Sequence, residues 1–173
     1  MIGILRTATT TNAAAGPDRL DARELSAWRG LLRVHASLSK ALDACLEAQH
    51  GLPLTSYEVL VYLADAEHQK MRMCDLAESV ILSRSGLTRL VDRLEREGLL
   101  VRETCSSDAR GSFAKLTPEG RERLRAARVT HLAQVRALFL DRLSPEELEL
   151  LGGIWERLLP DAVRAADSGD CGC

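Results

Sequence analysis

Polar side chains at the start of one predicted helix have the chemistry to contact nucleic acid. Guanidinium groups and hydroxyls are the donors that proteins place against base edges and phosphates in the major groove of DNA. A helix brings positions three and four apart onto one face, so these side chains would lie together. Double-stranded DNA is therefore the expected ligand. The candidate contacts on this helix are Ser83, Arg84, Ser85, Thr88 and Arg89.

The other face of the same helix is apolar, as it must be if a protein core is to hold the helix in place. Its residues recur three and four apart, which is typical of a buried helix face. They are Leu87, Leu90, Val91 and Leu94. Ser83 is a suitable N-cap, and Gly98 is a stop signal. The helix is therefore expected over Ser83–Glu97.

Two arginines of this helix have alternative partners inside the protein. Arg89 is close in sequence to the carboxylates of Asp92 and Glu95, which compete with DNA for its guanidinium. Arg93 is expected to pair within the protein, because pairs three or four residues apart meet on a helix surface.

A shorter helix and a hairpin flank this helix. The shorter helix precedes it and has an apolar stripe of Met73, Leu76, Ala77 and Val80. The hairpin follows, with strand-like runs over Leu99–Thr104 and Ser112–Leu116 around a polar loop. Arg110 near the tip of this loop could enter a narrow minor groove of DNA. A helix, a turn, a second helix and a hairpin in this order indicate a winged helix-turn-helix.

These segments resemble the MarR family of bacterial dimeric repressors. The similarity runs from about Trp28 to Leu159, and its most specific stretches are TRLVDRLEREGLL, DARG and LTPEG. The resemblance implies a winged helix-turn-helix dimer, with Ser83–Glu97 as the recognition helix and a wing that carries Asp108 and Arg110. Relatives often have two adjacent arginines after the wing aspartate, whereas here Ala109 precedes a single arginine.

Capping signals predict where the other helices begin, so the chain is expected to be mainly α-helical with a small β-wing. Side chains of these types bond to the first free N–H groups of a helix, and proline fits the first helical position. The signals are Asp21 with Glu24, Thr55 with Glu58, Thr117 with Pro118, and Ser144 with Glu147.

The first and last helices have more leucine side chains than the winged helix-turn-helix of one chain, called the reader below, can bury. The last has the stripe Leu148, Leu151, Trp155 and Leu158. A two-fold bundle, in which N- and C-terminal helices of two chains dimerise, would bury these residues and hold two readers about one DNA turn apart. Packing within one chain is the alternative. The expected parts are a disordered tail (1–17), an N-terminal dimerisation helix (18–52), the winged helix-turn-helix (53–117), C-terminal dimerisation helices (118–164) and a flexible tail (165–173).

The distribution of charge agrees with a DNA-binding surface, although the net charge is −2. Residues 70–125 contain 12 lysines and arginines against 9 acidic residues, and the remainder contains 11 against 16. Six scattered aromatic residues are too few for a base-stacking platform. No apolar run approaches the roughly 18 residues of a membrane span, and Met1–Leu5 is too short for a signal sequence. A cytoplasmic location without membrane partners is therefore expected.

Enzyme and metal-site motifs are not recognised in the sequence, so we expect no catalytic residue, metal or cofactor. Five cysteines without regular spacing are expected to be reduced thiols. Cys74 near a helix N-terminus and Cys105 near the wing are candidates for redox sensing, which needs an accessible thiolate. Cys45 lies on an apolar stripe and is expected to be inert.

The resemblance also implies a pocket for a small-molecule effector, lined by the first, second and fifth helices. The nominated residues are Trp28, His35, Tyr57 and Asp65, for which ordinary core or cap packing is the alternative. We therefore expect a cytoplasmic, homodimeric regulator that binds a pseudo-palindromic operator and acts as a repressor released by a small molecule. A thiol-oxidation sensor on the same scaffold is one alternative. A winged-helix protein-interaction module without DNA affinity is the other.

Overall fold

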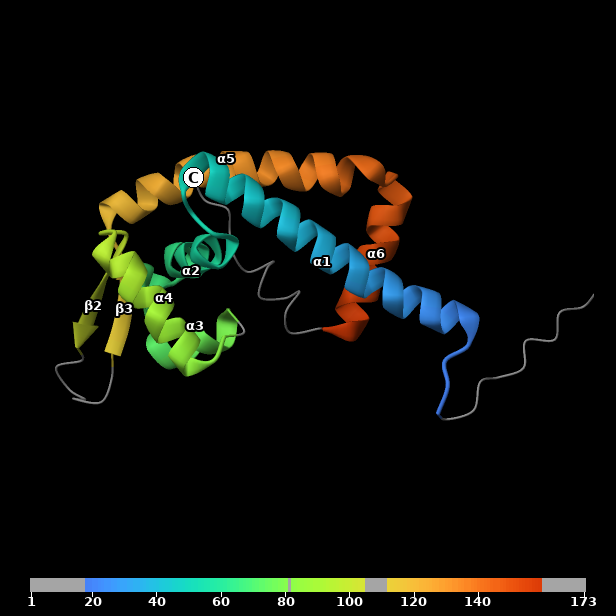
Figure 1. The fold of residues 1–173 in the computed structure, drawn as a ribbon, viewed down its shortest axis with the longest axis horizontal. Coiled ribbons are helices and arrows are strands. Elements are labelled where there is room, and N and C mark those ends of the chain that lie inside the picture. Colours follow the sequence, from blue (N-terminus) through green and yellow to red (C-terminus); the bar gives the residue numbers. More distant parts are fainter. Residues whose placement is uncertain (1–17, 81, 105–111, 160–173) are drawn as a thin grey trace, which may run out of the picture. The chain divides into compact units, whose positions relative to one another are not determined.

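The computed structural model describes residues 18–80, 82–104 and 112–159. Its elements, labelled in Figure 1, are α1 (Ala22–His50), α2 (Leu54–Asp65), η1 (Glu67–Gln69), β1 (Lys70–Arg72), α3 (Met73–Ser79), α4 (Arg84–Arg96), β2 (Leu100–Thr104), β3 (Ser112–Leu116), α5 (Pro118–Leu138), η2 (Leu140–Arg142) and α6 (Pro145–Leu158). The chain divides into two units, Met1–Ser37 and Leu38–Cys173. The predicted fold class, mainly helical with a small winged sheet, is confirmed.

The helix starts follow the predicted caps in all but one case. At α1, Glu24 N donates to Asp21 Oδ1 (2.9 Å) and Asp21 N to Glu24 Oε2 (2.7 Å), which is a reciprocal capping box. Ser83, Thr117 and Ser144 cap α4, α5 and α6 through their side-chain oxygens. These helices begin where the sequence predicts because their caps lie within a few residues of the N–H groups that they bind.

The predicted capping box of Thr55 and Glu58 is wrong. The α2 helix begins at Leu54, and its N-cap, Pro53, has no side chain that could accept a hydrogen bond. The Leu54 N–H donates instead to Asp43 Oδ1 of α1 at 2.8 Å. The cap is therefore tertiary, supplied from eleven residues upstream, which the local sequence pattern does not reveal.

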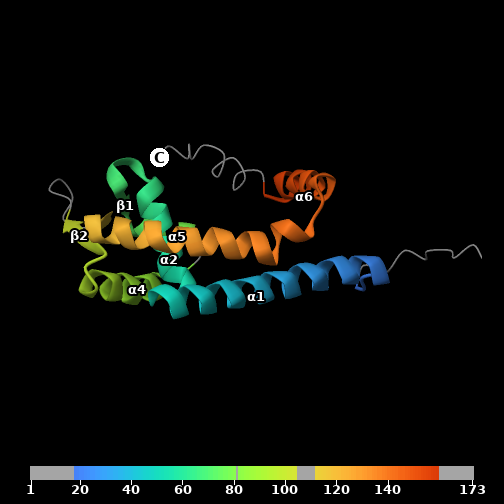
Figure 2. The same ribbon diagram turned by 90° about the horizontal axis from the view of Figure 1, so that it is seen from above.

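One core unites α2, α3, α4, the sheet and the first half of α5. The fully buried side chains include Leu60, Leu63, Leu76, Val91, Leu94 and Leu100. Figure 1 shows α3 and α4 beside the strands, and the view from above in Figure 2 shows α2 crossing α5. The reader therefore closes its own hydrophobic core within one chain.

The sheet has three antiparallel strands in the order β1-β3-β2. Lys70 pairs with Lys115, and Phe113 lies between Arg72 on one side and Glu103 on the other. The β1 strand was not predicted, because three residues with two basic side chains give no strand signal of their own. Its pairing with β3, more than forty residues later in the sequence, creates it.

Gly120 explains why the L-T-P-E-G stretch ends in glycine. A Cβ at this position would lie 2.0 Å from the carbonyl oxygen of Leu99. The first turn of α5 thus meets the backbone before β2 at a distance that only glycine permits. This contact fixes the start of α5 against the wing.

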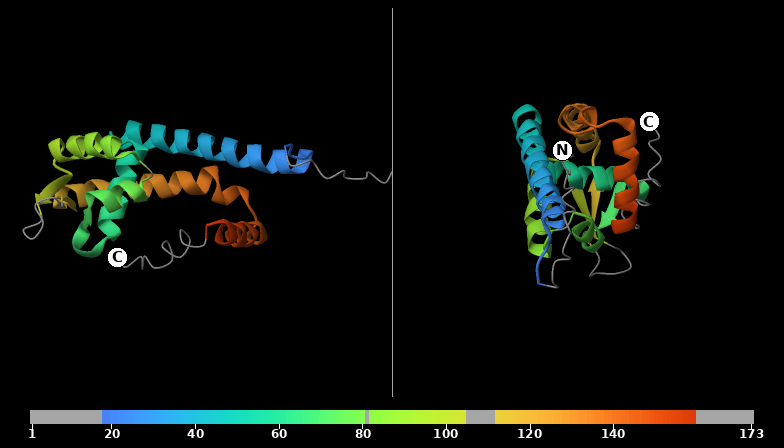
Figure 3. Two further views of the ribbon diagram at one scale, coloured as in Figure 1. Left: turned by 90° about the horizontal axis from the view of Figure 1, so that it is seen from below. Right: turned by 90° about the vertical axis from the view of Figure 1, so that its right-hand side faces the viewer.

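The end of α5 leads through η2 into α6, on the far side from the sheet (Figure 3). None of the α6 residues is buried, and Leu150 and Leu158 are 66% and 61% exposed. No helix in the described ranges is long and apolar enough to cross a membrane.

Candidate nucleic-acid interface

The back of α4 is held firmly by the core. Leu87 is 1% exposed, and Val91 and Leu94 are fully buried. The Ser83 hydroxyl accepts a hydrogen bond from Gly86 N at 3.1 Å, and Gly98 ends the segment with a φ of +74°. The predicted helix, its cap and its buried face are confirmed.

The opposite face of α4 is exposed and polar. Ser83, Ser85, Thr88 and Arg89 all lie at the surface, and the hydroxyls of Ser83 and Ser85 are 3.3 Å apart. Arg84 is the first residue of the helix. The structure therefore places Ser85, Thr88 and Arg89 on one exposed face of α4, next to the capping Ser83. The wing candidates Asp108 and Arg110 lie outside the described residues.

The two arginines on the α2-facing flank of α4 differ in their contacts. Arg89 is exposed and forms no hydrogen bond or ion pair with any described residue. Arg93 donates from Nη2 to the hydroxyl of Ser56, and its Nε lies 3.9 Å from Glu97 Oε1. The expectation that Arg93 pairs within the protein is confirmed, and its carboxylate partner Glu97 lies four residues further along the chain.

Arg102 of β2 connects the wing to α4. Its Nη1 donates to Glu95 Oε2 (2.7 Å), and its Nη2 donates to Asp92 Oδ1 (2.5 Å) and to the carbonyl oxygen of Thr88 (3.3 Å). Its backbone N–H donates to Glu95 Oε1 (2.9 Å). These four bonds fix the wing strand relative to the helix face that presents Thr88.

Sequence reasoning missed Arg102, although a signal was present. Leu100 and Arg102 are two apart in a strand and so share its inner face. A charged side chain there requires a partner, because arginine is rarely buried unpaired. The carboxylates of Asp92 and Glu95 on the preceding helix were the available acceptors.

The outer face of the sheet gathers positive charge around one carboxylate. Glu103 accepts hydrogen bonds from Lys70 (2.7 Å) and Lys115 (3.0 Å). These bonds, that of Lys70 first, hold the pKa of Glu103 below its ordinary value. The Phe113 ring lies under Lys70 Nζ at 4.6 Å and under the Arg72 guanidinium carbon at 5.3 Å. Two lysines thus pair with one carboxylate on this face, and Arg72 lies over the neighbouring Phe113 ring.

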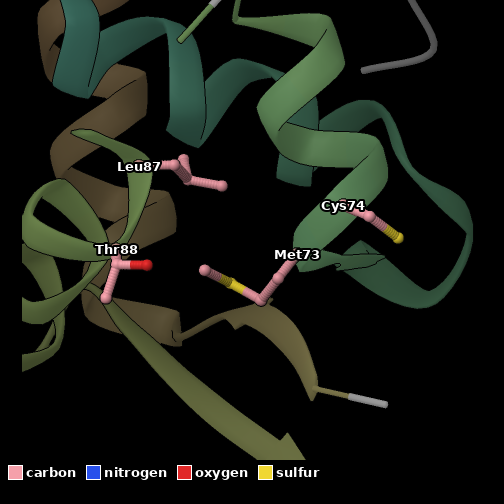
Figure 4. Close-up of a pocket in the computed structure, with 4 residues that line it drawn as sticks. All are labelled: Met73, Cys74, Leu87 and Thr88. Atoms are coloured by element: carbon pink, nitrogen blue, oxygen red, sulfur yellow. The ribbon is translucent and has the colours of Figure 1, made fainter. Parts of the chain in front are cut away.

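A hollow of about 270 Å³ separates the start of α3 from α4. It is lined by Met73, Cys74, Leu87 and Thr88, and Figure 4 shows Met73 pointing toward Thr88 while the Cys74 sulfur points away. Cys74 is exposed, and its thiol donates to Asp75 Oδ1 at 3.1 Å. Cys105 lies outside the described residues. A redox role for either cysteine stays a prediction.

The four nominated effector residues lie in different settings. Trp28 and His35 are exposed in the first unit. In the second unit, Asp65 is exposed and Tyr57 is buried. Burial raises the pKa of the Tyr57 hydroxyl; Arg128 opposes this shift and Asp65 adds to it.

Tyr57 has an aromatic partner that sequence reasoning missed. The ring of His131 on α5 lies 4.5 Å from the Tyr57 ring, centroid to centroid. Its Nδ1 is buried without a hydrogen-bond partner among the described residues. Burial and then the charge of Arg128 lower the pKa of His131. A signal was present, since Leu124, Ala127 and His131 follow the spacing of one helix face.

Metal ligation has no support in the described part of the chain, where no three or more His, Cys, Asp or Glu side chains gather in a way that could hold an ion. Cys45, expected to be inert, is partly buried and accepts a hydrogen bond from Gln49 Nε2 at 3.3 Å.

Comparison with known proteins identifies similar regulators. A family model described as "MarR family" matches residues 50–111. The crystal structure of Sco3205, a MarR family transcriptional regulator from Streptomyces coelicolor in complex with DNA, is 39% identical with a TM-score of 0.77, over 82% of this chain and 89% of that one. AbsC, another from this organism, is 37% identical with a TM-score of 0.76, over 85% and 98%. The transcriptional repressor YetL of Bacillus subtilis (strain 168) is 27% identical over 80% of this chain and 84% of that protein.

Proposed function

This chain belongs to the MarR family of transcriptional regulators, and we propose that it acts as a homodimeric repressor that leaves its operator when a small molecule binds. It is a DNA-binding regulator with a winged helix fold, as its similarity to a regulator solved with DNA indicates. Repression is the activity named for the similar YetL.

The exposed face of α4 is the observation that carries the DNA-reading role. Its apolar back is buried, while Ser85, Thr88 and Arg89 remain at the surface. We assign base contacts to Ser85 and Thr88, and phosphate or base contacts to Arg84 and Arg89. Ser83 would cap the helix beside the DNA, and Asp108 and Arg110 of the wing would lie at the minor groove.

The terminal helices support a dimer. Leu132 on α5 is 46% exposed, and Leu150, Leu158 and Leu159 at α6 are each more than 60% exposed. Within the first unit, Trp28 and Leu32 are about half exposed. We propose that residues 18–52 and 118–164 bury these side chains against a second copy, because soluble proteins rarely leave so much apolar surface uncovered.

A small-molecule response is proposed from the family resemblance together with one local feature. The buried Nδ1 of His131, beside the Tyr57 ring, has no hydrogen-bond partner among the described residues and offers a polar atom for a ligand, as binding pockets do. Trp28, His35 and Asp65 remain nominated for the same response.

Binding of the chain to the DNA that flanks its own gene, measured at several salt concentrations, tests the DNA-reading role. We expect binding that is selective over scrambled DNA and weakens steeply with salt, because several phosphates are neutralised. Ser85→Ala or Thr88→Val should relax base preference, and Arg110→Ala should weaken binding by about 1–3 kcal/mol. Equal affinity for scrambled DNA would contradict the assignment, and so would affinity that does not change with salt.

A further inference from the structure

A second hollow lies on the flank of α4 that faces the start of α2. Its volume is about 290 Å³, and it is lined by Thr55, Leu82, Gly86, Arg89, Leu90 and Arg93. The leucines supply the apolar part of its wall. The polar part consists of one hydroxyl and two guanidinium groups, and no acidic side chain is among the lining residues that the structure describes.

A hydrogen bond to a buried residue of α2 holds Arg93 in place at the edge of this hollow. Ser56 is 0% exposed, and its hydroxyl accepts a hydrogen bond from Arg93 Nη2. The Nε atom faces Glu97 at 3.9 Å, and Nη1 takes part in neither contact. A guanidinium has five N–H donors, so a fixed Arg93 retains donors for a ligand.

Two of the three acidic residues near the end of α4 are engaged elsewhere, and the third, Glu97, lies 3.9 Å from Arg93 Nε. Asp92 and Glu95 are both bonded to Arg102 on the other flank of the helix, at 2.5 and 2.7 Å. Arg89 has no ion pair with a described residue. The hollow therefore offers the Arg93 guanidinium, which Ser56 and Glu97 hold in place, the Arg89 guanidinium, which has no ion pair with a described residue, and the Thr55 hydroxyl of α2.

We propose that this hollow binds a backbone phosphate of operator DNA through Arg89, Arg93 and the Thr55 hydroxyl. Guanidinium forks match the geometry of phosphate oxygens, and hydroxyls commonly complete such contacts. Arg89 lines the hollow and also belongs to the face of α4 assigned to the major groove. The backbone of one DNA strand would therefore pass beside the hollow when α4 lies in the groove. The inference rests on the proposed DNA-reading function and adds Thr55 and Arg93 to it.

A chemical double-mutant cycle tests the contact directly. Single phosphates of the operator are replaced one at a time by neutral methylphosphonates, and affinity is measured for the wild type and for the Arg89→Gln, Arg93→Gln double variant. We expect one position in each half-site where the wild type loses about tenfold in affinity and the double variant loses almost none. If every position affects both proteins equally, the hollow binds no phosphate.

Salt dependence provides a second readout, which a purely structural role would not produce. Because both arginines serve one phosphate, the double variant should lower the salt slope by about one, not two. Thr55→Val should lower affinity with little change of slope, and Arg125→Gln on α5 should match the wild type. An unchanged slope in the double variant would overturn the proposal, and so would a fall of two.

Two further arms separate the possible failures. If Arg93→Gln does not fold, the cycle is run with Arg89→Gln and Thr55→Val, which leave the Ser56 contact intact. Inorganic phosphate alone should not stabilise the wild type saturably, and saturable stabilisation without any sensitive DNA position would mean a free-anion site. If the wild type itself shows no selective DNA binding, the proposed function fails; if it binds normally while the cycle shows no coupling, only the phosphate site fails.

Discussion

Helices α4 and α6 begin in the same way but lie in different surroundings. Ser83 accepts a hydrogen bond from Gly86 N at 3.1 Å, and Ser144 accepts one from Glu147 N at 3.3 Å. The apolar stripe of α4 is then buried, whereas none of the α6 residues is. A cap and an apolar stripe thus determine that a helix forms, but they do not determine which part of the protein buries the stripe. For α4 this cover is its own chain, and for α6 we propose a second copy.

The largest expected effect comes from charging the α6 stripe. The Leu151→Asp, Trp155→Asp double variant should yield monomers or unfolded chain, because carboxylates cannot be buried unpaired in an apolar seam. Operator affinity should fall by about 100-fold or more, since two linked readers bind far better than one. Sedimentation velocity and DNA titration measure both effects, with Arg157→Asp on the exposed side as control. A dimer that still binds tightly would show that the readers are joined elsewhere.

Shortening a buried side chain of the reader should lower the free energy of unfolding whether or not the protein is a dimer. Leu94 is fully buried, so Leu94→Ala should lower the free energy of unfolding by about 2–5 kcal/mol. In urea unfolding, this loss should be similar at low and high protein concentration, whereas Leu158→Ala should matter only where dimers form. A concentration-dependent loss for Leu94→Ala would contradict an intrachain core.

Replacing a glycine by alanine should lower stability in the reader and raise it in α6. Gly120→Ala should destabilise the reader by about 1–3 kcal/mol, because the new Cβ would overlap the Leu99 carbonyl. Gly153 in α6 has no atom within 4 Å of such a Cβ, so Gly153→Ala should stabilise the helix by about 1 kcal/mol. Thermal unfolding distinguishes the two, and a stabilising Gly120→Ala would mean that α5 does not approach the wing so closely.

The smallest expected effect is a pH dependence at the α2–α5 contact. Because the pKa of His131 is lowered in the folded state, the unfolded chain takes up this proton at higher pH. Stability should therefore fall as pH decreases from the ordinary histidine value of 6.5 toward the lowered value. His131→Gln should flatten this part of the profile in urea unfolding between pH 7.5 and 5. An identical profile in the variant would show that His131 does not contribute.

Local patterns predicted most of the fold, and distant partners account for the rest. The capped helices and the polar face of α4 were predictable because caps and stripes act within a few residues. The Asp43 cap of α2, the β1 strand and the hollow at Thr55 were not, because each depends on residues brought near only by folding. Arg102 and His131 did leave a signal in their strand and helix spacing, although the pattern does not reveal which residues they contact.

Protection mapping on the DNA that flanks the gene, with and without reductant, tests the central claim most directly. The account predicts a footprint with two-fold symmetry, in which two half-sites lie about 10–10.5 base pairs apart or a multiple of this, protected by one dimer. Removing the reductant should leave the footprint unchanged. A footprint of one unpaired half-site, or uniform protection without any preferred site, would contradict a dimeric, sequence-reading repressor.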